Sequence, residues 1–200
     1  MLGAVRGAAR SLRAAIANPA IRRVEAAYTG GIAGDWVLLV ALLVVAYQAG
    51  GPLGVGILGL VRMLPATLTG TFAGVPAARF GSRRVLVAAN ILRSLGAAGC
   101  AVGVWLGAPT AVVFIGAAIV ASAGVMVRPV QSALLPSLAK LPEELVAANV
   151  VSSLGEAVGT IIGPLLGGIL VASVSQAWGA GPTENGKSVW ALLPVTTAAR

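Results

Sequence analysis

Five ionisable side chains lie inside or at the edges of long apolar segments of this chain: Asp35, Arg62, Arg93, Arg128 and Glu156. A charge at the centre of a membrane-spanning helix costs roughly 2.5–3.5 kcal/mol, so such residues normally face the protein interior or a water-filled cavity. A carboxylate beside an arginine can form an ion pair, contact a charged ligand or take up a proton. We therefore treat all five as candidates for a substrate or proton pathway.

Two hypotheses follow from where these charges fall. Asp35 and Arg128 lie near the cytoplasmic ends of the first and fourth expected spans, and we predict that they approach each other. The alternative is that both side chains extend to the membrane interface. Nearer mid-membrane, we expect Glu156 and either Arg62 or Arg93 to line a central cavity, with Glu156 able to take up a proton. The alternative is a static pair that holds helices together.

Composition indicates which solvent surrounds these residues. The 200-residue chain is 58% hydrophobic and only 10% charged, whereas a soluble domain has about 25% charged residues. Its net charge of +8 is carried by cations placed between apolar runs, which indicates membrane topology and not nucleic-acid binding. The single cysteine and the lack of histidine exclude an internal disulfide and indicate neither a metal site nor an enzyme.

Five segments are long and apolar enough to cross ~30 Å of hydrocarbon as helices. We expect a basic cytoplasmic segment at 1–27, a transmembrane bundle at 28–174 and an atypical polar tail at 175–200. The N-terminal residues could form an interfacial helix, a transit peptide or a loosely ordered tail. The expected spans are 30–49, 53–77, 85–106, 110–127 and 147–174.

Cations occur on every second connector between these spans. Arg79, Arg83 and Arg84 fall between the second and third spans, and Arg128 and Lys140 fall between the fourth and fifth, while the other two connectors are uncharged. The positive-inside rule then places these connectors and the N-terminus in the cytoplasm of a multi-pass protein of the plasma membrane.

A row of glycines lies within the fifth span, with one glycine at every fourth residue: Gly155, Gly159, Gly163 and Gly167. Small residues at this spacing form a groove in which a second helix can pack closely, and Pro164 predicts a bend. A polar stripe lies beside the groove and should face protein or a cavity, although its hydroxyl groups could instead bond to their own helix. The stripe consists of Asn149, Ser152, Ser153, Glu156 and Thr160.

Two motifs resemble signatures of the major facilitator superfamily. G-T-I-I-G-P-L-L-G-G resembles the antiporter motif of the fifth helix, and G-V-P-A-A-R-F-G-S-R-R resembles the loop between helices two and three. The antiporter motif covers Gly159, Gly163, Pro164, Gly167 and Gly168. The loop motif covers Gly74, Arg79, Gly81, Arg83 and Arg84, with Ala78 in place of the family's Asp, which puts the usual gating network in doubt. The surroundings of Asp35 and Asn149 resemble the enterobactin-exporter branch.

The resemblance implies an all-α integral membrane protein, an N-terminal helix bundle of about five transmembrane helices from a six-helix half. It implies a truncated or fragmentary secondary transporter that exports amphipathic small molecules, driven by a proton gradient with no cofactor. Its expected partners are the lipid bilayer, the substrate, and a separate C-terminal half or a second copy. The alternative is a non-transporting assembly subunit whose glycine-rich helix packs against partner helices.

Overall fold

The computed structural model describes residues 17–139, 141–174, 177–183 and 186–192. Within this part the chain forms a bundle of helices followed by a small hairpin of two strands, and four of the helices are long and apolar enough to cross a membrane. The basic residues 1–16 and the last residues of the tail lie outside the described part. The elements are α2 (Pro19–Thr71), α3 (Gly74–Phe80), α4 (Ser82–Trp105), α5 (Thr110–Leu138), α6 (Pro142–Val174), β1 (Ala177–Thr183) and β2 (Gly186–Leu192).

Helix α2 consists of two arms, residues 19–49 and 52–71, which fold back on each other at Gly50 and Gly51. Gly51 has φ +57°, a left-handed conformation that suits glycine. Across the fold, Gly54 packs on the carbonyl of Ala46, whereas eight residues along a straight helix would separate them by roughly 12 Å. Each arm is long enough to span the hydrocarbon core of a bilayer, so the described helices provide five crossing segments.

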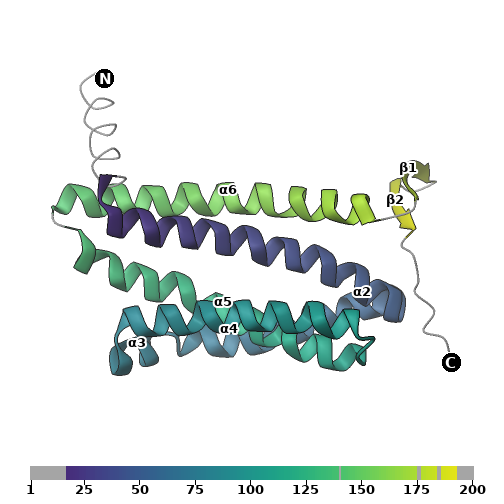
Figure 1. The fold of residues 1–200 in the computed structure, drawn as a ribbon, viewed down its shortest axis with the longest axis horizontal. Helices are drawn as coiled ribbons and strands as arrows, with labels where there is room; N and C mark the ends of the chain where they lie inside the picture. Colours follow the sequence, from purple (N-terminus) through teal and green to yellow (C-terminus); the bar gives the residue numbers. More distant parts are fainter. Residues whose placement is uncertain (1–16, 140, 175–176, 184–185, 193–200) are drawn as a thin grey trace, which may run out of the picture.

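The helices run side by side, with α6 packed along α2 and α4 packed along α5 (Figure 1). The start of α2, helix α3 and the start of α6 lie at one end of the bundle, which we call the α3 end. The fold in α2, the turn between α4 and α5, and the strand hairpin lie at the opposite end (Figure 1). Connectors with cations and connectors without them are therefore separated along the bundle, as expected from the sequence.

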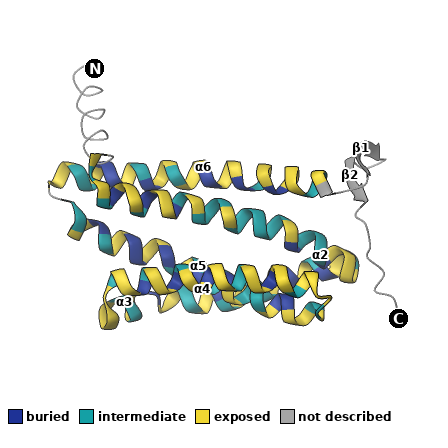
Figure 2. Cartoon of the chain, viewed as in Figure 1, coloured by how far each residue is buried: buried dark blue, intermediate teal, exposed yellow. Residues whose placement is uncertain are grey.

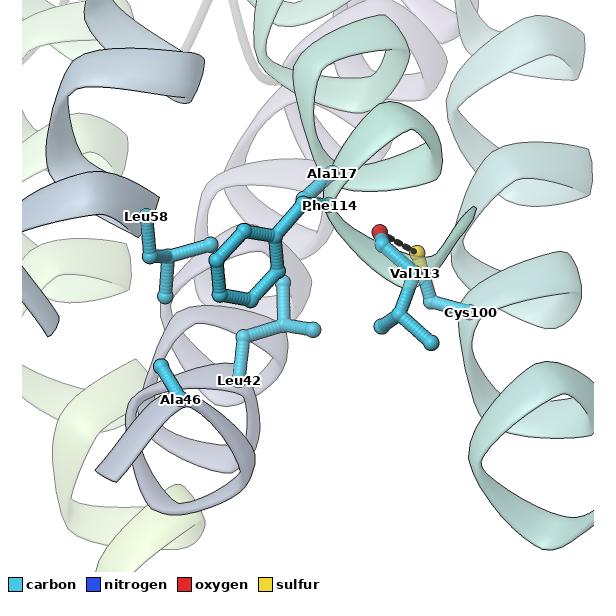
Figure 3. Packing of buried hydrophobic residues seen from close by; sticks show 7 residues of the cluster. All are labelled: Leu42, Ala46, Leu58, Cys100, Val113, Phe114 and Ala117. Atoms are coloured by element: carbon cyan, nitrogen blue, oxygen red, sulfur yellow. Dashed lines mark hydrogen bonds between the residues drawn. The ribbon is translucent and has the colours of Figure 1, made fainter. Parts of the chain in front are cut away.

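The core between α2, α4 and α5 is apolar. Leu58 on the second arm of α2 faces Leu42 and Ala46 on the first, and Phe114 packs between the arms (Figure 3). Cys100, Val113 and Ala117 complete this cluster. Large apolar side chains on the outside are widely exposed (Figure 2), among them Leu53 at 73% and Ile161 at 70%. Such a surface matches lipid and not water.

At the α3 end, the first arm of α2 and helices α5 and α6 extend beyond the expected spans, whereas the second arm of α2 is shorter than expected. Helix α2 begins at Pro19, well before residue 30, because Asn18 caps it through a 3.1 Å bond to the amide of Ala20 and proline stands at its first position. Helix α5 continues to Leu138 and α6 starts at Pro142. The second arm of α2 ends at Thr71 instead of residue 77, and the loop that follows contains the short helix α3.

The two-stranded hairpin was not expected from the sequence, which indicated only a polar, turn-rich tail. Strands β1 and β2 pair antiparallel, with Ala177 opposite Leu192 and Thr183 opposite Gly186. The hairpin follows directly after α6 and lies at the end of the bundle opposite α3 (Figure 1).

Candidate functional site

An ion pair joins α2 and α4 in the middle of the bundle. The guanidinium of Arg93 donates a 2.6 Å hydrogen bond to Asp35 Oδ2 and a 2.8 Å bond to the carbonyl of Gly31. A longer contact of 3.4 Å reaches Asn90 Oδ1. The Arg93 side chain is 8% exposed and that of Asp35 is 32% exposed. The pair is thus shielded on the arginine side and more open on the carboxylate side.

Two glycines make room for this pair. A Cβ at Gly31 would lie 3.0 Å from Arg93 Nη1, and a Cβ at Gly124 on α5 would lie 3.2 Å from Asp35 Oδ2. Both distances are shorter than ordinary van der Waals contact. The glycines therefore let helices α2 and α5 approach the charged groups closely, and a larger residue at either position would displace them.

Arg62, on the second arm of α2, adds a third charge to this region. Its side chain is half-buried, and its Nη1 atom is buried without a hydrogen-bond partner among the described residues. It lies within electrostatic range of Asp35. The interior near Asp35 therefore holds two cations and one anion, and one buried guanidinium nitrogen lacks an acceptor among the described residues.

A second ion pair lies nearer the α3 end and joins α5 to α6. Arg128 pairs with Glu156, and the same guanidinium donates a 2.9 Å hydrogen bond to the hydroxyl of Tyr28. The guanidinium carbon also lies 5.6 Å from the centre of the Tyr28 ring, within the range of a cation–π contact. Arg128 and Glu156 are 45% and 49% exposed. This pair is therefore reachable from outside the five described segments, unlike Arg93.

A third polar group is buried where α2, α5 and α6 meet. Glu25 Oε1 accepts hydrogen bonds of 2.6 Å from the Ser152 hydroxyl and 3.1 Å from the Gln131 amide. The three residues are 4%, 3% and 1% exposed. Glu25 Oε2 and Gln131 Oε1 are buried without a partner among the described residues. A carboxylate bonded this way ties three helices together.

Sequence reasoning missed Glu25, Tyr28 and Gln131. Glu25 was assigned to the basic N-terminal segment, but Asn18 followed by Pro19 is the signal that starts the helix there. Once α2 begins at Pro19, Glu25 lies three residues before Tyr28, and Tyr28 lies seven residues, about two helical turns, before Asp35 on the same side of the helix. Gln131 lies one helical turn beyond Arg128 and is found by extending α5.

The predicted approach of Asp35 to Arg128 is wrong. Asp35 pairs with Arg93, while Arg128 pairs with Glu156. Asp35 lies sixteen residues, roughly 24 Å, beyond Pro19 and so is far from the end of the helix at which it was expected. Arg93 likewise lies inside α4, roughly 16 Å beyond Ser82. The alternative of a static pair between Glu156 and Arg62 or Arg93 is wrong as well, because Glu156 pairs with Arg128, whereas the expectation that these residues line a central cavity stays a prediction.

The glycine row of α6 packs against the first arm of α2, as the spacing predicts. Gly155 contacts Thr29, and a Cβ at Gly159 would lie 2.9 Å from Ile32 Cγ2. Further along, a Cβ at Gly163 would lie 2.8 Å from the carbonyl of Ala33, and one at Gly167 would lie 2.9 Å from Val40 Cβ. The groove is therefore filled within the chain, so a partner helix could enter it only by displacing α2. Gly168 has open space beside it, and Pro164 is half-buried.

Of the polar stripe, Ser152 bonds to Glu25 and Glu156 to Arg128, whereas Asn149 and Ser153 bond to carbonyls of their own helix. For Ser152 the expectation of bonding within the helix is therefore wrong. Asn149 is exposed on α6 and remains a prediction as a pathway residue.

The loop motif forms the α3 end of the bundle. Gly74 starts α3 and Arg79 lies in its last turn, which matches a cation to the negative end of the helix dipole. Gly81 separates α3 from α4 with φ +84°, so glycine is required there by the backbone. Arg83 and Arg84 follow in the first turn of α4 and are exposed.

These features define a multi-pass membrane protein whose long helices are joined by ion pairs. The sequence profile of the Major Facilitator Superfamily matches residues 26–183, which is most of the chain. The chain belongs to this superfamily of transporters. Searches of curated proteins and of solved structures gave no significant match.

Proposed function

We propose that the chain contributes to a proton-coupled exporter of amphipathic small molecules in the plasma membrane. The observation that carries the proposal is the Arg128–Glu156 ion pair, which is about half exposed on each side although both helices are of spanning length. Charges at this place in a spanning helix should face protein or a water-filled path. The path would run between α5 and α6, and Glu156 would exchange a proton there as the pair opens and closes.

Asp35, Arg93 and Arg62 would form the inner part of the same path. The Asp35 side chain is more exposed than that of Arg93, and the buried Arg62 Nη1 atom has no hydrogen-bond partner among the described residues. A substrate with a polar head and an apolar body could bind its head there. A second copy or a separate C-terminal half would supply the opposite wall, as in transporters built from paired helix bundles.

The full chain should be reconstituted in liposomes with a pH-sensitive dye inside and ethidium as the amphipathic probe. We expect an inward proton gradient to accelerate ethidium efflux and Glu156→Gln to abolish this acceleration. Glu143→Gln is the matched control, because Glu143 is exposed in the first turn of α6. Proton-dependent efflux that survives Glu156→Gln would reject the coupling role, and efflux in neither form would reject transport of this probe by the chain alone.

The proposal includes an orientation with the α3 end in the cytoplasm. It is supported by the cations that gather there, with Arg22 and Arg23 at the start of α2, Arg79 at the end of α3, and Arg83 and Arg84 at the start of α4. A cysteine placed at Ser82, with Cys100 replaced by alanine, should react with a membrane-impermeant maleimide only after spheroplasts are permeabilised. Labelling of intact spheroplasts would show that the α3 end lies outside the cytoplasm.

A further inference from the structure

Two apolar grooves meet at the start of α4. The first has a volume of about 740 Å³ and lies between the second arm of α2, α4 and α5. The second has a volume of about 720 Å³ and lies between the start of α4 and the end of α5. Both are lined by Phe80, Arg84 and Ala88. The two grooves therefore diverge from a common point that carries a cation.

The common point is strongly basic. Arg83 lines the second groove and Arg84 lines both. Both side chains are exposed, and within the described residues neither forms a hydrogen bond or an ion pair. Residues 74–105 contain no Asp or Glu, so nothing on α3 or α4 neutralises these charges. A ligand that fills both grooves would thus meet two guanidinium groups without counter-ions where the grooves join.

The first groove runs from the α3 end into the membrane-spanning part of the bundle. It is lined by Arg84 at the α3 end, by Leu92 further along α4, and by α5 between Ile115 and Met126. Met126 lies twelve residues, roughly 18 Å, before the end of α5 at Leu138, so the groove reaches well beyond the surface at which Arg84 lies. An acyl chain lying in it would begin beside the arginines and run into the hydrocarbon core.

We propose that the two grooves hold one anionic diacyl phospholipid, with its phosphate at Arg83 and Arg84 and one acyl chain in each groove. Arginine forms charge-assisted hydrogen bonds to phosphate oxygens, and basic pockets between helices at a membrane surface select anionic headgroups. The junction at Phe80 and Ala88 separates the two chains. This site is independent of the proposed export path through Glu156.

Charge favours a lipid over a second copy of this chain as the occupant. A two-fold related copy would bring its own Arg83 and Arg84 against the same point, and like charges at close range repel. The net charge of +8 adds an overall repulsion between two copies of the chain. An anionic lipid supplies the opposite charge and the apolar chains at once.

The test is native mass spectrometry of the full chain, released from detergent after addition of phosphatidylglycerol or phosphatidylcholine. We expect one phosphatidylglycerol to stay bound at collision energies that remove phosphatidylcholine. Arg83→Gln with Arg84→Gln should weaken its retention by about 25-fold, which is about fivefold, or 1 kcal/mol, for each arginine near an anionic surface. Ala88→Trp, which fills both grooves, should weaken binding while both arginines remain.

Arg79→Gln is the matched control, because Arg79 belongs to the same cluster but lines neither groove. It should weaken retention by less than about threefold if binding is local. An equal loss in this variant would show diffuse charge attraction and overturn the proposal. Competition by millimolar inorganic phosphate would show a headgroup site without acyl chains. A dimer that persists without lipid and dissociates when Ala88→Trp is introduced would show that a second copy of the chain occupies the grooves. Either result also overturns it.

Discussion

The carboxylate of Asp35 lies 2.6 Å from the guanidinium of Arg93, and this ion pair links two helices that otherwise make few contacts. Helix α4 packs mainly on α5, and α6 packs mainly on the first arm of α2. The pair therefore joins α4 directly to α2 near the centre of the bundle. Helix α5 also packs extensively on α2, so the pair adds a direct link between α4 and α2 to the connection that α5 already provides.

We expect Asp35 and Arg93 to be energetically coupled. Asp35→Ala leaves a guanidinium that is only 8% exposed without its counter-ion, and loss of one partner of a buried pair costs about 3–5 kcal/mol. Arg93→Ala should cost a similar amount. The double variant should be less destabilised than the sum by about 0.5–3 kcal/mol, measured as the free energy of unfolding in mixed detergent micelles.

Asp35→Ala with Ser94→Ala serves as the control cycle, because Ser94 is exposed on the same helix as Arg93 and bonds to neither residue. These two changes should add within about 0.5 kcal/mol. Additivity of Asp35→Ala with Arg93→Ala to the same precision would contradict the pairing.

A glycine within the row of α6 and a glycine outside it should respond differently to an added methyl group. A Cβ at Gly159 would lie 2.9 Å from Ile32 and 3.0 Å from the carbonyl of Thr29, whereas Gly168 has open space. Gly159→Ala should destabilise the bundle by about 1–3 kcal/mol through overpacking. Gly168→Ala should be neutral or slightly stabilising, because alanine is the better helix former by about 1 kcal/mol. Thermal unfolding in detergent would compare the two, and equal losses would place the α2 contact elsewhere.

Neighbouring serines on α6 should differ sharply when replaced. Ser152 is 3% exposed and donates to Glu25, so Ser152→Ala leaves a buried carboxylate with one donor fewer and should cost about 1.5–3 kcal/mol. Ser153 is exposed and bonds only to the carbonyl of Asn149, so Ser153→Ala should stay within about 0.5 kcal/mol of the parent. Chemical unfolding would measure both. The same small loss in both variants would show that Glu25 does not depend on Ser152.

Features confined to one helix could be predicted from the sequence. The row from Gly155 to Gly167 repeats every fourth residue, so its common face follows from helix geometry alone. The separation of charged and uncharged connectors likewise needs only the order of spans along the chain. Both were expected, and the structure has both.

The partners of the charges could not be predicted, because each depends on the relative depth of two helices. Asp35 was expected near an end of its helix because the first span was taken to begin at residue 30. The helix begins at Pro19 instead, and Glu25 in this earlier part is bonded by two other helices. Long-range hydrogen bonds of this kind leave no local pattern in a single sequence.

The single cysteine offers a probe of contact between α4 and α5. Cys100 is 2% exposed, and a Cβ at Gly116 on α5 would lie 2.8 Å from its sulfur. We expect N-ethylmaleimide to label the folded chain at least about 100-fold more slowly than the chain unfolded in dodecyl sulfate, because the thiol is reached only through local opening. Gly116→Ala should separate the helices at this point and speed labelling of the folded chain by about tenfold. Gly99→Ala is the matched control on α4, since Gly99 has no neighbour within 4 Å. Its labelling rate should match the parent, and acceleration by Gly99→Ala equal to that by Gly116→Ala would refute the close contact of Gly116 with Cys100.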